Sequence, residues 1–215
     1  MKPLPLQLTC LLLMSSPPAW ALQDATLPNE SVCQVTGEAT CCCTTSQAAV
    51  SRTTATYSLP KLRLTDADGN SISLATALSR AHPVVMQFAF TSCSTICPVA
   101  SATMASVQKS LGDQAKQVRF CTISIDPEYD TPARLTEFSK TLGADAGWCF
   151  LTGDPHDISL VQKAFTAYVP NKSRHEPLTF VRAANSDQWL RITGLVSTKD
   201  LLADVQSVLA RTEKP

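Results

Sequence analysis

The fold of this chain is decided by the sequence Val84-Val85-Met86-Gln87-Phe88-Ala89-Phe90, which is followed at once by Thr91-Ser92-Cys93-Ser94-Thr95-Ile96-Cys97-Pro98. The first stretch is a short apolar run with branched and aromatic residues, which predicts a strand buried on both faces. Residues 98–111 predict a helix, because a proline suits the first turn and a glycine follows the last residue. Cys93 and Cys97 therefore lie where a strand passes into a helix, and positions four apart share one helix face.

Two thiols that converge at a helix N-terminus form a redox dithiol, half of a metal site or a stable disulfide. The unpaired N–H groups and the positive end of the helix dipole favour thiolate over thiol. No Lys, Arg or His lies within or beside the Cys93–Pro98 motif, so only the helix end would lower a thiol pKa. The missing cation weakens the case for a fast oxidoreductase and leaves room for a metal ion to supply positive charge.

The rest of the chain alternates predicted strands and helices. A hairpin is predicted over residues 59–74, since Asp66-Ala67-Asp68-Gly69-Asn70 supplies the positive-φ positions of a tight turn. The further elements are a short helix over 73–80, strands over 118–125 and 148–151, helices over 131–142, 154–165 and 198–210, and an antiparallel pair over 177–182 and 188–193. This order predicts an α/β fold with helices flanking a central mixed sheet and a hairpin at its N-terminal end. A catalytic or ligand loop directly after the first core strand is the thioredoxin-like arrangement.

The N-terminal residues predict export. Residues 1–21 combine a basic start, an apolar stretch and the end Ala19-Trp20-Ala21, which is the pattern of a cleavable signal peptide. The apolar stretch is short for a membrane span, and an uncleaved anchor is the alternative interpretation. Residues 22–56 lack hydrophobic periodicity and predict a flexible, cysteine-rich arm, and residues 57–211 predict the globular domain. The expected location is the periplasm.

Of the nine cysteines in the chain, Cys10 falls in the predicted signal peptide. An exported protein keeps few free thiols, because an oxidising compartment drives them into disulfides or onto metals. Within the arm, Cys33 and the consecutive Cys41-Cys42-Cys43 predict either a disulfide-stapled extension or an accessory Cu(I) or thiol-exchange site. Cys121 and Cys149 fall on predicted core strands, where a free cysteine packs as a small apolar side chain.

Charge and spacing exclude several functions. The chain has 18 Lys and Arg against 18 Asp and Glu, and it is of one-domain length once the signal peptide is removed. Balanced charge gives no attraction to nucleic acid or anionic lipid, so neither is an expected partner. Asp126 and Asp130 flank a loop with no nucleophile nearby, which favours a supporting or helix-leading role over general acid–base catalysis.

A soft ion held by two thiolates needs a third ligand, and imidazole is a common choice. The chain has three histidines. His82 lies in the turn before the first core strand, at the end opposite the cysteines, and His156 lies in the first turn of a helix, so both are expected at the surface. His175 lies in a polar loop just before a strand, where a thioredoxin-like fold brings a loop against the dithiol. His175 is therefore the candidate third ligand.

Three segments carry a family resemblance, namely Phe88-x-Phe90-Thr91-x-Cys93-x-x-x-Cys97-Pro98, Ser124-Ile125-Asp126-Pro127-Glu128-x-Asp130-Thr131-Pro132, and His175 ahead of a strand. Through them, residues 57–209 resemble the Sco/SenC family, thioredoxin-fold copper proteins associated with assembly of the dinuclear copper A centre of cytochrome c oxidase. The resemblance implies copper, as Cu(I) or Cu(II), held by Cys93, Cys97 and His175, with Asp126 supporting the site from outside the ligand set. It also implies a cytochrome c oxidase subunit as the partner that receives copper, and membrane proximity through that partner.

Two functions follow from this resemblance and from the thiol pair. The first is an exported metallochaperone, not an enzyme, that delivers copper to a partner metalloprotein by ligand exchange. The second is a thiol–disulfide oxidoreductase that keeps the partner's copper-ligand cysteines reduced. Both need the reduced dithiol, because a disulfide cannot supply thiolate ligands. A thiol peroxidase is disfavoured, because no basic residue adjoins Cys93 or Cys97.

Overall fold

The computed structural model describes residues 50–212 of the chain. The predicted signal peptide over residues 1–21 and the cysteines of the predicted arm, Cys33 and Cys41 to Cys43, lie outside the described residues. Their roles stay predictions. Of the helices that the structure does describe, none combines the length and the apolar character that a membrane crossing needs.

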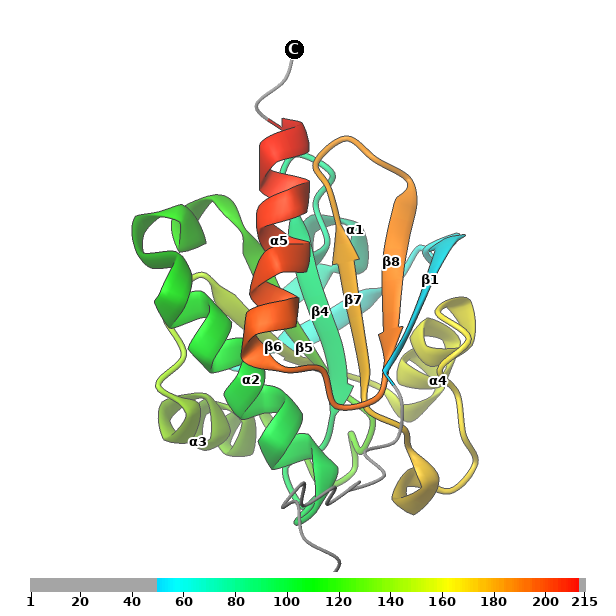
Figure 1. The fold of residues 1–215 in the computed structure, drawn as a ribbon. Coiled ribbons are helices and arrows are strands. Elements are labelled where there is room, and N and C mark those ends of the chain that lie inside the picture. Colours follow the sequence, from blue (N-terminus) through cyan, green and yellow to red (C-terminus); the bar gives the residue numbers. More distant parts are fainter. Residues whose placement is uncertain (1–49, 213–215) are drawn as a thin grey trace, which may run out of the picture. The chain divides into compact units, whose positions relative to one another are not determined.

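The described residues form one mixed, eight-stranded sheet with the strand order β1-β8-β7-β4-β5-β6-β2-β3 (Figure 1). The strands are β1 (Ser51–Thr56), β2 (Arg63–Asp66), β3 (Ser71–Ser73), β4 (Val84–Ala89), β5 (Arg119–Ser124), β6 (Trp148–Thr152), β7 (Leu178–Arg182) and β8 (Gln188–Thr193). Strands β4, β5 and β6 run parallel, whereas β7 pairs antiparallel with both β4 and β8. The mixed sheet, the β2–β3 hairpin and the β7–β8 pair confirm the predicted architecture.

Strand β1 is an edge strand formed by residues that the sequence assigns to the arm. It pairs antiparallel with β8, from Ser51 opposite Thr193 to Thr56 opposite Gln188. Most of its side chains are exposed, so the sequence shows no apolar alternation there. The sheet therefore begins at residue 51 and not at residue 57, because β8 offers unpaired backbone groups that β1 satisfies.

Helices cover both faces of the sheet, as the sequence predicts. They are α1 (Leu74–Ala77), α2 (Ile96–Leu111), α3 (Pro132–Leu142), α4 (Pro155–Ala164) and α5 (Thr198–Thr212). Helices α2, α3 and α5 enclose one apolar cluster with the sheet, and α2 and α5 lie side by side in front of it in Figure 1. Helices α1 and α4 enclose a second cluster on the other face. Strand β4 is buried at every residue, because both of its faces are covered.

The ends of α3 and α4 are set by local hydrogen bonds. The Thr131 hydroxyl accepts a hydrogen bond from the Arg134 N–H at the start of α3, and the Asp154 carboxylate accepts one from the His156 N–H at the start of α4. Gly143 ends α3 in the left-handed region, with a φ of 62° that glycine adopts without strain. These caps confirm the helix ends predicted from the sequence.

Cys121 and Cys149 lie opposite each other on the neighbouring parallel strands β5 and β6. Cys121 is fully buried, and Cys149 packs against the same apolar cluster from a partly buried position. Burial raises the pKa of the Cys121 thiol well above its usual range, so this thiol stays protonated and packs as an apolar group. The predicted core role of both cysteines is confirmed.

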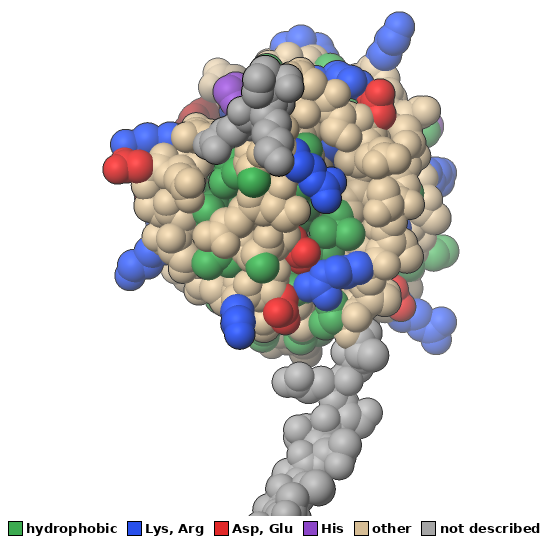
Figure 2. All heavy atoms as spheres, turned by 45° about the horizontal axis from the view of Figure 1, so that its top comes forward, with side chains coloured by type: hydrophobic (Ala, Val, Ile, Leu, Met, Phe, Trp, Pro, Cys, Tyr) green, Lys and Arg blue, Asp and Glu red, His purple; other side chains and the backbone are tan. Residues whose placement is uncertain are grey.

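Side chains of both charge signs are interspersed over the face shown in Figure 2, with apolar side chains between them. On this face, the described residues form no block of a single sign that would attract nucleic acid or anionic lipid.

Candidate metal centre

Three segments of the chain meet at one end of the sheet. Parallel pairing puts Ala89, at the end of β4, opposite Ser124, at the end of β5. Strand β7 runs antiparallel to β4 and therefore begins at that same end. The cysteine segment after β4, the segment of Asp126 after β5 and the segment of His175 before β7 are neighbours for this reason.

Cys93 and Cys97 occupy different parts of the connection between β4 and α2. Cys93 lies in the turn before the helix, where its N–H donates to the Phe90 carbonyl at 3.2 Å. Its sulfur is partly exposed and lies 3.6 Å from the Thr95 hydroxyl oxygen. Cys97 is the second residue of α2 and is buried, with 3% of its surface exposed. The sequence placed both thiols on one helical turn, but α2 begins at Ile96 and leaves Cys93 outside the helix.

The two thiols differ in acidity. Partial burial raises the pKa of the Cys93 thiol, but hydrogen bonds from the backbone and side chains of Cys97 and Thr95 outweigh it and lower the pKa to about 7. Burial raises the pKa of the Cys97 thiol to about 12, and the neighbouring Cys93 and Asp130 add to this effect. Near neutral pH, Cys93 therefore exchanges between thiol and thiolate with both forms populated, whereas Cys97 keeps its proton until a cation displaces it.

His175 is buried near this pair. It follows the short 3-10 helix η2 (Lys172–Arg174), and 5% of its surface is exposed. Neither Nδ1 nor Nε2 has a hydrogen-bond partner among the described residues. Burial lowers the pKa of the His175 imidazole to about 4, so the ring is neutral at physiological pH and one nitrogen has a free lone pair. Buried polar atoms are normally paired, and two unpaired nitrogens on one ring indicate a ligand position.

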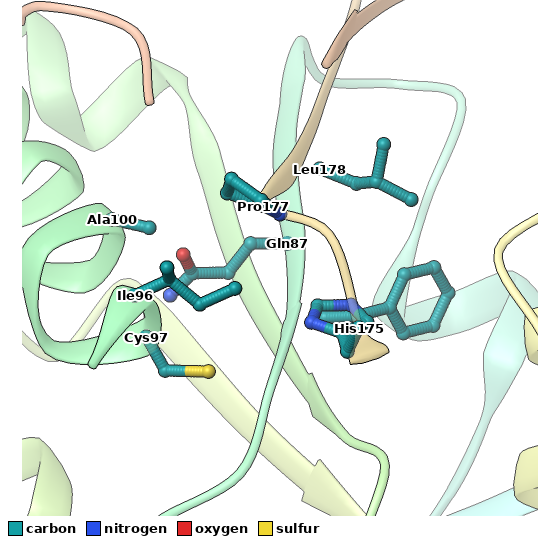
Figure 3. A pocket seen from close by; sticks show the side chains of 8 residues that line it. Gln87, Ile96, Cys97, Ala100, His175, Pro177 and Leu178 are labelled. Atoms are coloured by element: carbon teal, nitrogen blue, oxygen red, sulfur yellow. The ribbon is translucent and has the colours of Figure 1, made fainter. Parts of the chain in front are cut away.

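Figure 3 shows the narrow pocket between these side chains. It is lined by Gln87, Phe88, Ile96, Cys97, Ala100, His175, Pro177 and Leu178. The Cys97 sulfur and the His175 ring point toward the same space, one from α2 and the other from the segment before β7. Gln87 donates through Nε2 to the Ser101 and Thr122 hydroxyls at 2.8 and 3.1 Å, while its Oε1 is unpaired within the described part of the chain. The pocket therefore combines an apolar lining with unpaired polar atoms.

The donors around this pocket fit a soft metal ion. Among residues 50–212, no three Cys, His, Asp or Glu side chains are already close enough to hold a metal together. However, two thiols and an unpaired imidazole meet at one end of the sheet, and thiolate with imidazole is a donor set for copper. Cys93, Cys97 and His175 are the residues that would hold such an ion here.

The other two histidines lie outside the site. Both His82, in the turn before β4, and His156, in the first turn of α4, are exposed, as predicted. Neither lines the pocket that Cys97 and His175 share.

Asp130 holds the cysteine segment in place. Its buried carboxylate accepts hydrogen bonds from the Thr91 N–H at 3.1 Å and from the Thr91 and Ser124 hydroxyls at 2.5 and 2.6 Å. Thr91 lies two residues before Cys93, so this carboxylate sets how the thiol turn leaves β4. The sequence indicates only a supporting or helix-leading role for Asp130. Its spacing of four residues from Asp126 is the sequence signal for a hydrogen-bonded turn between them.

Asp126 lies near the site without lining the pocket. Its carboxylate pairs with the Lys172 ammonium group, and its N–H donates to the Ser124 hydroxyl at 3.0 Å. Lys172 lies three residues before His175. Sequence reasoning missed Lys172, because its partner is 46 residues away and no motif joins the two.

Sequence comparison places this arrangement among known proteins. The profile of the SCO1/SenC family matches residues 50–209. The chain belongs to the SCO1/SenC family. Two curated relatives of this SCO1/SenC chain are the SCO1 protein homolog of Bacillus subtilis, 35% identical over 99 residues, and protein SenC of Rhodobacter capsulatus, 31% identical over 99 residues. The alignments cover 45% and 46% of the chain and 50% and 44% of the relatives, so the chain spans about half the length of the curated relatives it matches.

Solved structures share the fold of this SCO1/SenC chain. BsSco, a member of the Sco family of cytochrome c oxidase assembly proteins with a disulfide switch, is 28% identical, with a TM-score of 0.60 over 71% of this chain and 94% of BsSco. Bradyrhizobium japonicum ScoI, solved with copper bound, is 25% identical, with a TM-score of 0.58 over 72% of this chain and 99% of ScoI. The predicted thioredoxin-like fold is thereby confirmed.

The buried His175 should make the stability of the SCO1/SenC protein depend on pH. Its pKa is about 4 in the folded protein against an ordinary 6.5, so the unfolded chain binds the proton more readily as the pH falls. The contribution of His175 is fully present above the ordinary pKa and is lost as the pH falls toward the folded value, by up to about 3 kcal/mol. Urea unfolding of the metal-free protein between about pH 7 and about pH 4.5 measures this loss.

Matched variants separate this contribution from the rest of the acid sensitivity. His175→Gln should lose the component of the pH dependence that His175 supplies, whereas the exposed His82→Gln should keep it. An identical pH dependence in the wild type and in His175→Gln would contradict the buried, neutral state of the ring.

The acidity difference between the thiols predicts selective alkylation. In the reduced, metal-free protein, iodoacetamide should modify Cys93 first, at a rate that rises through about pH 7, because thiolate is the reactive form. Cys97 should react at least about 100-fold more slowly, since burial keeps it protonated. Peptide mapping by mass spectrometry follows both sites, and earlier modification of Cys97 would overturn the assignment.

Proposed function

We propose that this SCO1/SenC protein is an exported, periplasmic metallochaperone that delivers copper to the copper A site of a cytochrome c oxidase subunit. The observation that carries the proposal is the buried His175 ring, which has two unpaired nitrogens and faces the same pocket as Cys97. The copper-bound ScoI structure supports copper as the cargo. The cytochrome c oxidase assembly role of the family of BsSco supports the recipient.

Cys93, Cys97 and His175 are the proposed ligands. Soft thiolates suit Cu(I), and imidazole suits copper in either oxidation state. The buried Cys97 must lose its proton when copper binds, because the ligand is the thiolate and the cation stabilises it. The neutral His175 needs no such step. Copper uptake at neutral pH therefore releases a proton mainly from Cys97.

The redox state of the thiol pair gates copper binding. Reduced Cys93 and Cys97 supply two thiolates, whereas a disulfide between them supplies none. The disulfide switch of BsSco supports such a gate. Copper loading would then report that the site is reduced.

Delivery requires an open side and a surface for the recipient. Cys93 is the partly exposed ligand, so an incoming thiolate can reach the ion beside it. The large apolar side chains exposed in residues 50–212 all belong to segments at this end of the sheet, namely Val99, Tyr129, Tyr168 and Leu195. Exposed apolar side chains at the end of the sheet that carries the thiols are available for contact with a protein partner. A membrane-bound recipient would bring the chaperone to the membrane surface.

Copper titration of the reduced, metal-free protein tests the ligand set. In competition with a Cu(I) chelator, Cys93→Ala, Cys97→Ala and His175→Ala should each weaken the affinity by about 100-fold or more, because each removes one of three donors. His156→Ala, which changes an exposed histidine, should match the wild type.

Unchanged affinity in His175→Ala would overturn the three-ligand site. Copper held by the cysteines of the arm would be common to all of these proteins, so the difference between them still reports on this site.

A thiol–disulfide reductase is the second candidate, and the unequal acidity of Cys93 and Cys97 favours it. The Cys93 thiolate would attack one sulfur of the partner's disulfide and release the other as a thiolate. Cys97 would then lose its proton to the released partner thiolate, attack the Cys93 sulfur and release the second partner thiolate. The partner gains two electrons, Cys93 and Cys97 become a disulfide, and a dithiol reductant must restore them.

The two candidates differ in their need for His175. With a purified recipient domain in the reduced form, copper transfer from His175→Ala should fall by about 100-fold, following its weaker binding. With the oxidised recipient, the metallochaperone should reduce the disulfide no faster than a small-molecule dithiol does. Rapid reduction by wild type and His175→Ala alike, unaffected by a copper chelator, would favour the reductase.

A further inference from the structure

Two carboxylates in the turn after β5 contact different halves of the site. Asp130 contacts the segment that leads to Cys93, and Asp126 contacts the segment that leads to His175. We propose that the turn from Asp126 to Asp130 is a brace that sets the position of His175 relative to the thiol pair. In this brace, the Asp126–Lys172 ion pair is the contact that holds the His175 segment. Lys172 and Asp126 are then positioning residues of the metal site.

The turn itself is rigidly connected. The N–H groups of Tyr129 and Asp130 both donate to the Asp126 carbonyl, at 3.0 and 2.8 Å. The Ser124 hydroxyl donates to the Asp130 carboxylate at 2.6 Å and accepts from the Asp126 N–H at 3.0 Å. These bonds fix the two carboxylates relative to each other. The contact of Asp130 with Thr91 and the contact of Asp126 with Lys172 therefore have fixed relative positions.

The side of the brace that contacts the segment leading to Cys93 is buried. The Asp130 side chain is fully enclosed, and its contacts with the N–H and hydroxyl of Thr91 hold the backbone two residues before Cys93. Removing this carboxylate would leave several buried donors without a partner, which destabilises the whole fold. Asp130 is therefore the fixed end of the brace.

The side of the brace that contacts the segment leading to His175 includes an exposed lysine, so this contact can be removed by a single substitution. Lys172 opens η2, and its carbonyl accepts a hydrogen bond from the His175 N–H at 3.1 Å, so a shift of Lys172 is passed to His175. The Lys172 ammonium group pairs with Asp126 and also lies 5.7 Å from the centre of the Phe90 ring, which belongs to the cysteine segment. The Lys172 side chain is 45% exposed and that of Asp126 10% exposed. Because the lysine reaches the carboxylate from the solvent side, it can be replaced without opening the core, and the effect of its loss falls first on the local position of His175.

Carbethoxylation of His175 by diethyl pyrocarbonate tests the brace without any metal, since this reagent modifies accessible, neutral imidazole. In the wild type, the buried His175 should react far more slowly than the exposed His82 and His156. Lys172→Met should raise the His175 rate by about two- to fivefold, the population shift that a partly exposed ion pair can cause. The rates of His82 and His156 serve as internal references and should not change.

Matched variants separate the ion pair from a general loss of charge. Arg174→Met removes a cation from the same short helix, and Arg174 has no ion pair with another residue in the described range. Arg174→Met and the conservative Lys172→Arg should both leave the His175 rate at the wild-type value. Asp126→Asn should reproduce the Lys172→Met effect, and the double variant should add nothing further, because the two residues act through one contact.

An unchanged His175 rate in Lys172→Met, an equal rise in Arg174→Met, or additive effects in the double variant would each overturn the brace. The copper arm of the test rests on the proposed function. There, Lys172→Met and Asp126→Asn should weaken Cu(I) affinity by about two- to fivefold and alter the visible spectrum of the Cu(II) form, whereas Lys172→Arg should restore both. Failure of the wild type to bind copper would refute the metallochaperone, while the modification rates would still decide the brace.

Discussion

The position of β4 between β5 and β7 is the constraint on which the rest of this structure depends. Its backbone pairs on both edges and its side chains are covered on both faces, so all of its residues are buried. A strand in this position can present chemistry only beyond its ends. Parallel pairing with β5 and antiparallel pairing with β7 bring the ends of three segments together, and this convergence places Cys93, Cys97 and His175 at one end of the sheet.

Different degrees of burial then give these three side chains different protonation states. Burial keeps His175 neutral with an unpaired nitrogen, and it keeps Cys97 protonated until a cation arrives. Cys93 lies outside the helix, partly exposed, with N–H groups around its sulfur that lower its pKa to about 7. A reactive, partly exposed thiol therefore lies beside an enclosed thiol and an enclosed imidazole, so the site is approached from the side of Cys93.

Polar contacts around the pocket, more than the side chains that line it, fix the positions of the cysteine segment and the His175 segment. The turn from Asp126 to Asp130 joins the segment of Cys93 to that of His175, and both of its carboxylates are buried, Asp130 completely. The same end of the sheet carries the exposed apolar groups Val99 and Tyr129. Rigid support of the thiol turn is thus combined with an ion pair whose lysine is exposed to solvent.

Local sequence patterns predict the buried strand, the helix caps at Thr131 and Asp154, the thiol pair and the core position of Cys121. Each of these depends on residues close together in the chain or on burial that composition predicts. Tertiary structure alone decided the rest. Strand β1 has exposed side chains and exists because β8 has an open edge. Which of the two thiols is the acidic one follows from where α2 begins, and the Lys172–Asp126 contact joins residues 46 positions apart. Such features depend on which segments the sheet brings together in space. Local sequence patterns cannot predict contacts between segments that are far apart in the chain.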